Sequence, residues 1–229
     1  MLRWLGAGPF RKDGPAVIIT VKTNIYIDGF NLYYRAVKGT PYRWLNLHEL
    51  CRRLLKPDDH INRIRYFTAL ITARPDDPQG PQRQQVYIRA LETIPCLSVH
   101  HGSFLTNTRR MRLANPSPGG PNTAEVIHTE EKGSDVNLAT YLLMDAFDQD
   151  FELAVVLSGD SDLAYPIEVV HRRFRLPVIV WDPGRLPGQK LRQVASFHKQ
   201  IRPSALRDSQ FPPVLYDVQG RPITKPMGW

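Results

Sequence analysis

The feature of this sequence that most constrains its fold is the alternation of short apolar segments with stretches of helical periodicity. The apolar segments have the length of strands and lie at residues 24–27, 61–72, 97–104, 151–157 and 176–183. The helical patterns lie at residues 30–37, 45–55, 82–94, 135–150 and 161–173. Strands separated by helices along one chain predict an α/β fold, in which a parallel sheet carries helices on both faces.

Interruptions of this pattern divide the chain into three parts. Residues 1–22 carry Gly, Pro and mixed charges and are interpreted as an N-terminal extension. Residues 23–205 hold the alternating pattern and predict one domain, with a basic loop or hairpin inserted near 105–130. Residues 206–229 are too rich in Pro for a long helix and too apolar for a free tail, so we expect them to pack along the domain surface.

The charge of the chain favours a polyanionic partner. The 229 residues carry a formal net charge of +8, which attracts polyanions through long-range electrostatics and phosphate contacts. The acids and bases are also segregated: residues 97–124 and 183–207 contain no Asp or Glu. Because many basic proteins bind no nucleic acid, the charge alone leaves the nature of the partner open.

Several classes of protein are disfavoured by the composition. The two cysteines, Cys51 and Cys96, lie far apart and have no zinc-type spacing to histidines, so neither a disulfide framework nor a structural zinc site is indicated. No apolar run reaches the ~20 residues that span a bilayer, and the N-terminal apolar stretch is too short for a secretory signal. We therefore expect a cytoplasmic protein without membrane association.

Acidic residues follow two of the predicted strands. Asp28 ends the first strand, and Asp160 and Asp162 follow the strand that begins near Phe151. Asp135 lies at the start of a predicted helix. In an open parallel sheet the strands finish at the same edge at which the helices begin, so these carboxylates are expected to lie close together. Taken singly, each acid also fits a turn or a helix cap.

Grouped carboxylates at an apolar sheet edge would repel one another unless protons or a cation neutralise them. A hard divalent cation, Mg²⁺ or Mn²⁺, accepts carboxylate oxygens and keeps positions open for water. Such an ion can polarise a phosphodiester and activate a water molecule for attack. This chemistry agrees with the preference for polyanions that the net charge indicates.

Three blocks of the sequence, IYIDGFNLYY, EEKGSDVNLA and VVLSGDSDL, occur in this order. They resemble the signature blocks of the NYN domain, in the LabA-like (DUF88) branch of the PIN-like nucleases. The resemblance covers roughly residues 22–205. It implies a three-layer α/β/α sandwich with a central, mainly parallel sheet, and a metal-dependent nuclease site that is usually inferred to act on RNA.

Carried over by position, the resemblance assigns catalytic and metal-binding roles to Asp28, Asp135, Asp160 and Asp162. Asn31 matches the asparagine after the first acid, where its amide would orient water, hold a carboxylate or contact phosphate, and Ser158 is assigned a similar role. Ser134 and Leu163 depart from the family pattern, in which Val and an aromatic residue are common. Both departures affect packing next to the acids rather than the acids themselves.

Further substrate contacts are candidates in the basic insertion. Arg109, Arg110 and Arg112 would track a phosphate backbone, with Phe104 or Tyr34 stacking on bases. A solvated basic loop is the competing interpretation. Lys132 would neutralise a phosphate, although a lysine before glycine is commonly a solvated side chain. His100, His101 and His128 are not required by the proposed chemistry.

Two functional classes remain open from the sequence. The first is a Mg²⁺- or Mn²⁺-dependent phosphodiesterase that cleaves nucleic acid, RNA in preference to DNA, by water attack. The second is a regulatory module of the same fold that binds nucleic acid or a protein partner without appreciable turnover. The retention of all four acids favours the first. A phosphatase acting on small monoesters is a further enzymatic alternative, and homodimer formation is left open.

Overall fold

A central sheet of six strands organises the molecule, for which the computed structural model describes residues 20–184 and 188–229. Most of the extension predicted for residues 1–22 therefore lies outside the described residues. The sheet strands are β1 (Val21–Asp28), β2 (Asp59–Thr68), β3 (Leu97–His101), β6 (Leu153–Leu157), β7 (Val178–Asp182) and β8 (Phe197–Gln200). Every neighbouring pair of these strands is parallel. The predicted α/β fold with a parallel sheet is confirmed.

The sheet order, β3-β2-β1-β6-β7-β8, reverses direction at one point. From β1 the chain adds β2 and β3 on one side, and from β6 it adds β7 and β8 on the other. The adjacent strands β1 and β6 therefore form a topological switch point, beyond whose carboxyl ends α/β proteins bind their ligands. Because β1 and β6 pair directly, with Ile27 opposite Leu157, the segments that follow them emerge side by side.

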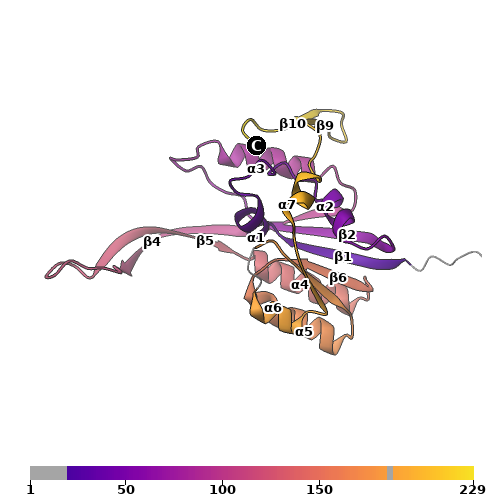
Figure 1. Cartoon of the computed structure of the whole chain (residues 1–229). Coiled ribbons are helices and arrows are strands. Elements are labelled where there is room, and N and C mark those ends of the chain that lie inside the picture. Colours follow the sequence, from indigo (N-terminus) through magenta and orange to yellow (C-terminus); the bar gives the residue numbers. More distant parts are fainter. Residues whose placement is uncertain (1–19, 185–187) are drawn as a thin grey trace, which may run out of the picture.

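Helices cover both faces of the sheet, which gives three layers (Figure 1). The helices and helical turns are α1 (Gly29–Leu32), η1 (Tyr33–Val37), α2 (Leu47–Leu54), α3 (Gly80–Leu91), α4 (Ser134–Phe147), η2 (Ser161–Leu163), α5 (Ala164–Arg173), α6 (Gln189–Val194) and α7 (Pro203–Arg207). One core cluster lies beneath α2, α3 and α7, and a second lies beneath α4, α5 and α6. Side chains of β1 point alternately into the two clusters: Ile25 and Ile27 lie in the first and Tyr26 lies in the second.

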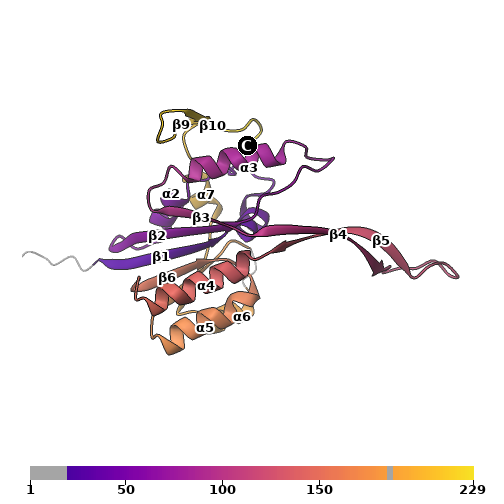
Figure 2. The ribbon, with the colours of Figure 1, turned by 180° about the vertical axis from the view of Figure 1, so that it is seen from behind.

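The segment predicted as one strand at 97–104 is divided at Gly102. There the chain leaves the sheet edge and begins a two-stranded antiparallel ribbon, β4 (Ser103–Arg112) and β5 (Thr123–Lys132). A Cβ atom at Gly102 would lie 2.6 Å from the Lys132 carbonyl oxygen, so only glycine allows the ribbon strands to approach so closely there. The ribbon projects far from the sheet and its helices (Figure 2).

The residues after α7 form a small antiparallel hairpin, β9 (Val214–Tyr216) and β10 (Pro222–Thr224), beside α3. Phe211 and Ile223 are buried in the first core cluster, against which Trp229 also packs. The indole N–H of Trp44 donates to the Pro212 carbonyl oxygen at 2.8 Å. The C-terminal segment is thus attached to the domain by apolar burial and by backbone contacts.

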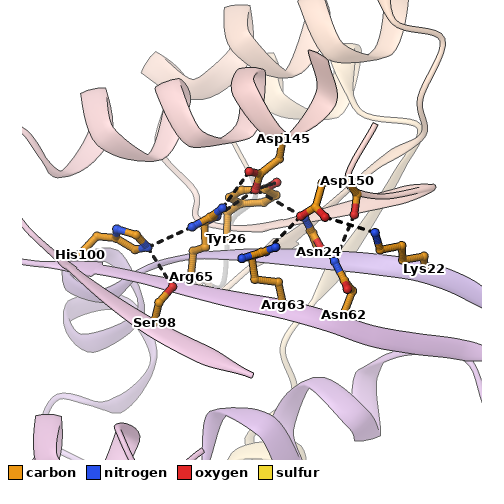
Figure 3. Close-up of polar contacts among 10 residues, drawn as sticks. All are labelled: Lys22, Asn24, Tyr26, Asn62, Arg63, Arg65, Ser98, His100, Asp145 and Asp150. Atoms are coloured by element: carbon orange, nitrogen blue, oxygen red, sulfur yellow. Dashed lines mark hydrogen bonds and ion pairs between the residues drawn. The ribbon is translucent and has the colours of Figure 1, made fainter. Parts of the chain in front are cut away.

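A buried polar network joins the sheet to α4 (Figure 3). Both carboxylate oxygens of Asp145 accept hydrogen bonds from Arg65, at 2.8 and 2.9 Å, and the Tyr26 hydroxyl donates to the same carboxylate at 2.7 Å. The Arg65 guanidinium also lies 4.4 Å from the centre of the Tyr141 ring. Burial and then the Asp145 charge raise the pKa of Tyr26 well above its ordinary value, so this hydroxyl stays protonated and donates.

No helix in residues 20–184 or 188–229 is long and apolar enough to cross a bilayer.

Candidate active site at the switch point

Asp28 connects the two strands of the switch point. It is the last residue of β1 and the N-cap of α1, and its Oδ1 accepts the Asn31 backbone N–H at 2.9 Å. Its Oδ2 accepts a hydrogen bond from the Ser158 hydroxyl, also at 2.9 Å. Ser158 follows β6 directly and is fully buried. The sequence therefore ends an apolar strand with a carboxylate that both starts a helix and fixes the neighbouring strand end.

The loop after β6 is shaped by further polar contacts. The Asn31 side-chain oxygen accepts the Gly159 backbone N–H at 2.9 Å, and the Ser158 hydroxyl accepts the Asp160 N–H at 3.0 Å. Asp160 then caps the short turn η2 by accepting the Asp162 N–H at 2.9 Å. Through these hydrogen bonds, Asn31 and Ser158 hold the loop that carries Asp160.

Asp135 approaches the same edge from the first turn of α4. Burial, followed by repulsion from the Asp28, Asp160, Glu131 and Asp162 charges, raises the pKa of Asp135 to about 6. Burial also raises the pKa of Asp28, despite the two hydrogen bonds that it accepts, and the Asp160 and Glu131 charges add to the rise. Negative charges of neighbouring acids therefore contribute to the raised pKa of each of these two carboxyls, as expected where like charges lie close together.

Glu131 is an acid of this region to which the sequence interpretation gave no role. It belongs to β5, and its side chain accepts the Ser134 backbone N–H at 3.1 Å, where α4 begins. The signal was present in the sequence, because Glu131 lies within the EEKGSDVNLA block. The sequence did not show that β5 pairs along its whole length with β4, so that the start of β4 and the end of β5 lie together beside the start of α4.

Arg35 contacts the loop that follows β6 and pairs with Asp182 at the end of β7. Arg35 donates to the Gly159 carbonyl oxygen at 3.2 Å, and its guanidinium lies 3.5 Å from the buried Asp182 carboxylate at the end of β7. A Cβ atom at Gly159 would lie 2.7 Å from Cζ of Arg35, so any larger residue there would displace the Arg35 guanidinium from the loop. Neither Arg35 nor Asp182 was predicted to belong to the site.

The chemistry of this donor set fits a hard divalent cation, since it consists of carboxylates, two of which, Asp28 and Asp135, have pKa values raised first by burial and then by neighbouring negative charges. The spacing of these side chains, however, does not form a closed metal site. Within residues 20–184 and 188–229, no three Asp, Glu, His or Cys side chains converge closely enough to enclose an ion. Both oxygens of Asp28 are instead occupied by protein donors.

The predicted basic contacts lie away from the acids, on the ribbon. Arg109 is 3.9 Å from Glu130, and Lys132 pairs with the same glutamate at 2.7 Å near the base of the ribbon. Arg110 stands opposite Glu125 in the β4–β5 register, and Arg112 lies toward the ribbon tip. Both arginines are exposed to solvent. The structure therefore places the three arginines on a projecting arm (Figure 1) rather than beside Asp28.

The raised pKa of Asp135 predicts that this residue destabilises the protein above pH 6 when no metal is bound. Its pKa of about 6 in the folded protein exceeds the ordinary value of 3.8, so stability is lost as pH rises between these values. Asp135→Asn should therefore stabilise the protein at pH 7.5, by roughly 1–2 kcal/mol after allowance for solvent screening. At pH 4 the gain should nearly vanish.

Urea unfolding in EDTA at the two pH values measures this effect. Asp58→Asn is the matched control, since Asp58 is an exposed carboxylate just before β2, where the sheet strands begin. A variant that is less stable than the wild type at both pH values would contradict the proposed repulsion.

A parallel α/β sandwich with acids at its switch point is the arrangement of the PIN-like domains. The NYN domain family matches residues 22–201, and the chain belongs to this family, which lies within the PIN-like nuclease superfamily.

Two known proteins resemble the chain. One is the 6-hydroxy-3-succinoylpyridine 3-monooxygenase HspA of Pseudomonas putida (strain DSM 28022 / S16), which is 30% identical over 91% of this chain and 75% of its own length. The other is a crystal structure of a protein of unknown function, VPA0982, from Vibrio parahaemolyticus RIMD 2210633. It has a TM-score of 0.49 and 20% identity, with 80% of this chain and 94% of that chain covered.

Proposed function

We propose that this protein is a divalent-metal-dependent nuclease that hydrolyses phosphodiester bonds, with RNA as the favoured substrate. The observation that carries the proposal is the polar junction at the switch point, where Ser158 links Asp28 to the loop that carries Asp160. Beside it, burial and then the charges of Asp28 and Asp160 raise the pKa of Asp135. Membership of the NYN family and the net charge of +8 support the same chemistry.

The carboxylates have separate roles in this proposal. Asp28, Asp135 and Asp160 would hold a Mg²⁺ or Mn²⁺ ion directly, and Asp162 would do so directly or through water. When bound, such an ion stabilises charge on the phosphodiester and activates water for attack, which would leave a 5′-phosphate. Because Asp28 is fixed by its hydrogen bond from Ser158, it offers a rigid anchor, while Asp135 and Asp160 would close toward the cation.

The decisive assay follows labelled single-stranded RNA and DNA in Mg²⁺, Mn²⁺ or EDTA. We expect cleavage in either metal, faster cleavage of RNA, and none in EDTA. Full activity in EDTA would overturn the metal-dependent proposal. Salt-dependent RNA binding without any cleavage would instead favour a regulatory module, and turnover of p-nitrophenyl phosphate without RNA cleavage would favour a phosphatase.

The ribbon arginines predict a measurable electrostatic contribution to RNA binding. Changing Arg109, Arg110 and Arg112 to Gln should weaken RNA binding and reduce the salt slope by about 2, because each lost contact to a single strand removes about 0.7 of slope. Fluorescence anisotropy at several salt concentrations measures both effects.

The matched control for the ribbon variant is Arg172, Arg173 and Arg175, all exposed and at or just beyond the end of α5, changed together to Gln. This variant loses the same charge at a different place. Equal losses in the two triple variants would show that net charge, rather than the ribbon, governs binding.

A second candidate function is the oxygenation of a small aromatic molecule. It is favoured by the 30% identity to the Pseudomonas monooxygenase over 91% of this chain and by an aromatic-lined cavity near Asp28. Product analysis of 6-hydroxy-3-succinoylpyridine after incubation in air with a reduced nicotinamide tests it. Hydroxylated product in the absence of RNA cleavage would replace the nuclease proposal.

A further inference from the structure

A cavity of about 270 Å³ lies beside the candidate active site, among α1, η1, α3 and the base of the ribbon. Its walls include a group of aromatic side chains, among them Phe30, Tyr33, Tyr34, Tyr87, Phe104 and Trp229. Cavities of this size and lining hold one small ligand with a flat ring. Gly29 and Phe30, which follow Asp28 directly, belong to the lining. The cavity and the carboxylates therefore share the end of β1.

Two aromatic rings of the cavity lining pack against Phe30. The Tyr34 ring lies 6.4 Å from it with an interplanar angle of 23°, and the Phe104 ring lies 5.6 Å from it in an edge-on orientation. Tyr34 is nevertheless 52% exposed. The π-helical turn η1 carries Tyr34 to the cavity while directing Arg35 to the Gly159 loop. An exposed aromatic ring beside other rings is a platform on which a further ring can stack.

Positive charge predominates among the polar groups of the lining. Lys38, Arg43, Arg74 and Arg83 face two acids, Asp76 and Asp77. The Lys38 ammonium lies over the Tyr34 ring, 4.8 Å from its centre, so a cation already covers part of one face of this ring. Nε of Arg43 is buried without a hydrogen-bond partner among the described residues. Such a donor is costly unless a ligand group satisfies it.

We propose that this cavity holds an unpaired nucleobase of the RNA strand, with the base stacked on Tyr34 and an adjacent phosphate against the cations. The inference rests on the proposed nuclease function and deepens it by assigning a base-binding subsite next to the carboxylates. A base in this place leaves its sugar and phosphate to extend along Gly29 toward Asp28. Single-stranded substrates are then preferred, because a paired base is not free to enter.

The test measures binding of uridine 5′-monophosphate in EDTA, by calorimetry or saturation-transfer NMR, against ribose 5-phosphate, which lacks the base. We expect the nucleotide to bind at least about tenfold more tightly. Tyr34→Ala should remove about tenfold of nucleotide affinity and leave ribose 5-phosphate unchanged, whereas Tyr34→Phe should retain stacking. Phe147→Ala is the control, since Phe147 is an exposed aromatic residue at the far end of α4.

Several results would overturn the subsite. These are equal binding of the two phosphates, unchanged nucleotide affinity in Tyr34→Ala, or binding of the aromatic acid nicotinate without binding of the nucleotide. Because the measurement excludes metal and turnover, it separates the two proposals. Nucleotide binding by a protein that never cleaves RNA would contradict the nuclease function alone, and cleavage without nucleotide binding would contradict the subsite alone.

Discussion

Asp28→Asn is expected to lower metal-dependent RNA cleavage by roughly 100- to 1000-fold. The substitution removes the negative charge of the most buried of the four predicted carboxylates, which is 6% exposed. Cation assistance to phosphodiester hydrolysis is worth several kcal/mol, which corresponds to a factor of this size. The measurement is the initial rate of cleavage of labelled RNA under saturating Mg²⁺, with Mn²⁺ in a parallel series.

The loss should occur without unfolding. Burial raises the pKa of Asp28, so a neutral amide there relieves a cost to the folded state. The Asn side chain can still accept a hydrogen bond from the Asn31 backbone, which Asp28 accepts at 2.9 Å. Thermal melting in EDTA should therefore show no decrease in stability. Asp58→Asn, at the opposite end of the sheet, should retain wild-type activity, and an Asp28→Asn protein that cleaves within a few-fold of wild type would remove Asp28 from the chemistry.

Asp145→Ala is expected to destabilise the protein by about 3–5 kcal/mol, the usual result of breaking a buried ion pair. The Arg65 and Asp145 side chains are only 11% and 8% exposed. Removing the carboxylate leaves the Arg65 charge without its ion-pair partner and the Tyr26 hydroxyl without its acceptor. For a chain of this length the melting temperature should fall by roughly 6–20 °C, as measured by circular dichroism.

Two comparisons sharpen this prediction. Asp148→Ala removes an exposed carboxylate three residues further along, just after α4, and should leave the melting temperature within about 2 °C of wild type. The double variant Arg65→Met, Asp145→Leu should lose less stability than Asp145→Ala, because no unpaired charge remains buried. If Asp145→Ala and Asp148→Ala have the same melting temperature, the network shown in Figure 3 does not hold α4 to the sheet.

Local sequence patterns accounted for five strands of the central sheet and for part of the site, but they did not predict the edge strand β8. The apolar run before Asp28 and the run before Ser158 both form buried strands, β1 and β6. Because parallel strands end at one edge, Asp28 and Asp160 were predicted to share that edge, and the loop contacts through Ser158 join them there. The resemblance of three sequence blocks indicated the family, which the match over residues 22–201 shows.

Residues whose roles depend on distant partners were not predicted. Glu131 is close to Asp135 along the chain, but its effect on the distant Asp28 depends on the fold. Arg35 reaches Asp182 because β1 and β7 flank β6. Arg65 lies in the predicted strand at 61–72, and the sequence analysis assigned it no role. In the fold its side chain is covered by α4, whose Asp145 lies 80 residues away in the sequence.

The sequence by itself determined the strands β1, β2, β3, β6 and β7 and the helices between them, because periodicity and apolar content are local properties of the chain. It also determined that carboxylates follow two strands at the same edge of the sheet. Only the tertiary structure decided that β1 and β6 are neighbours, that the arginines stand on a projecting ribbon, and that an aromatic cavity adjoins Asp28. These features arise from strand order and from packing between distant segments, which local patterns do not encode.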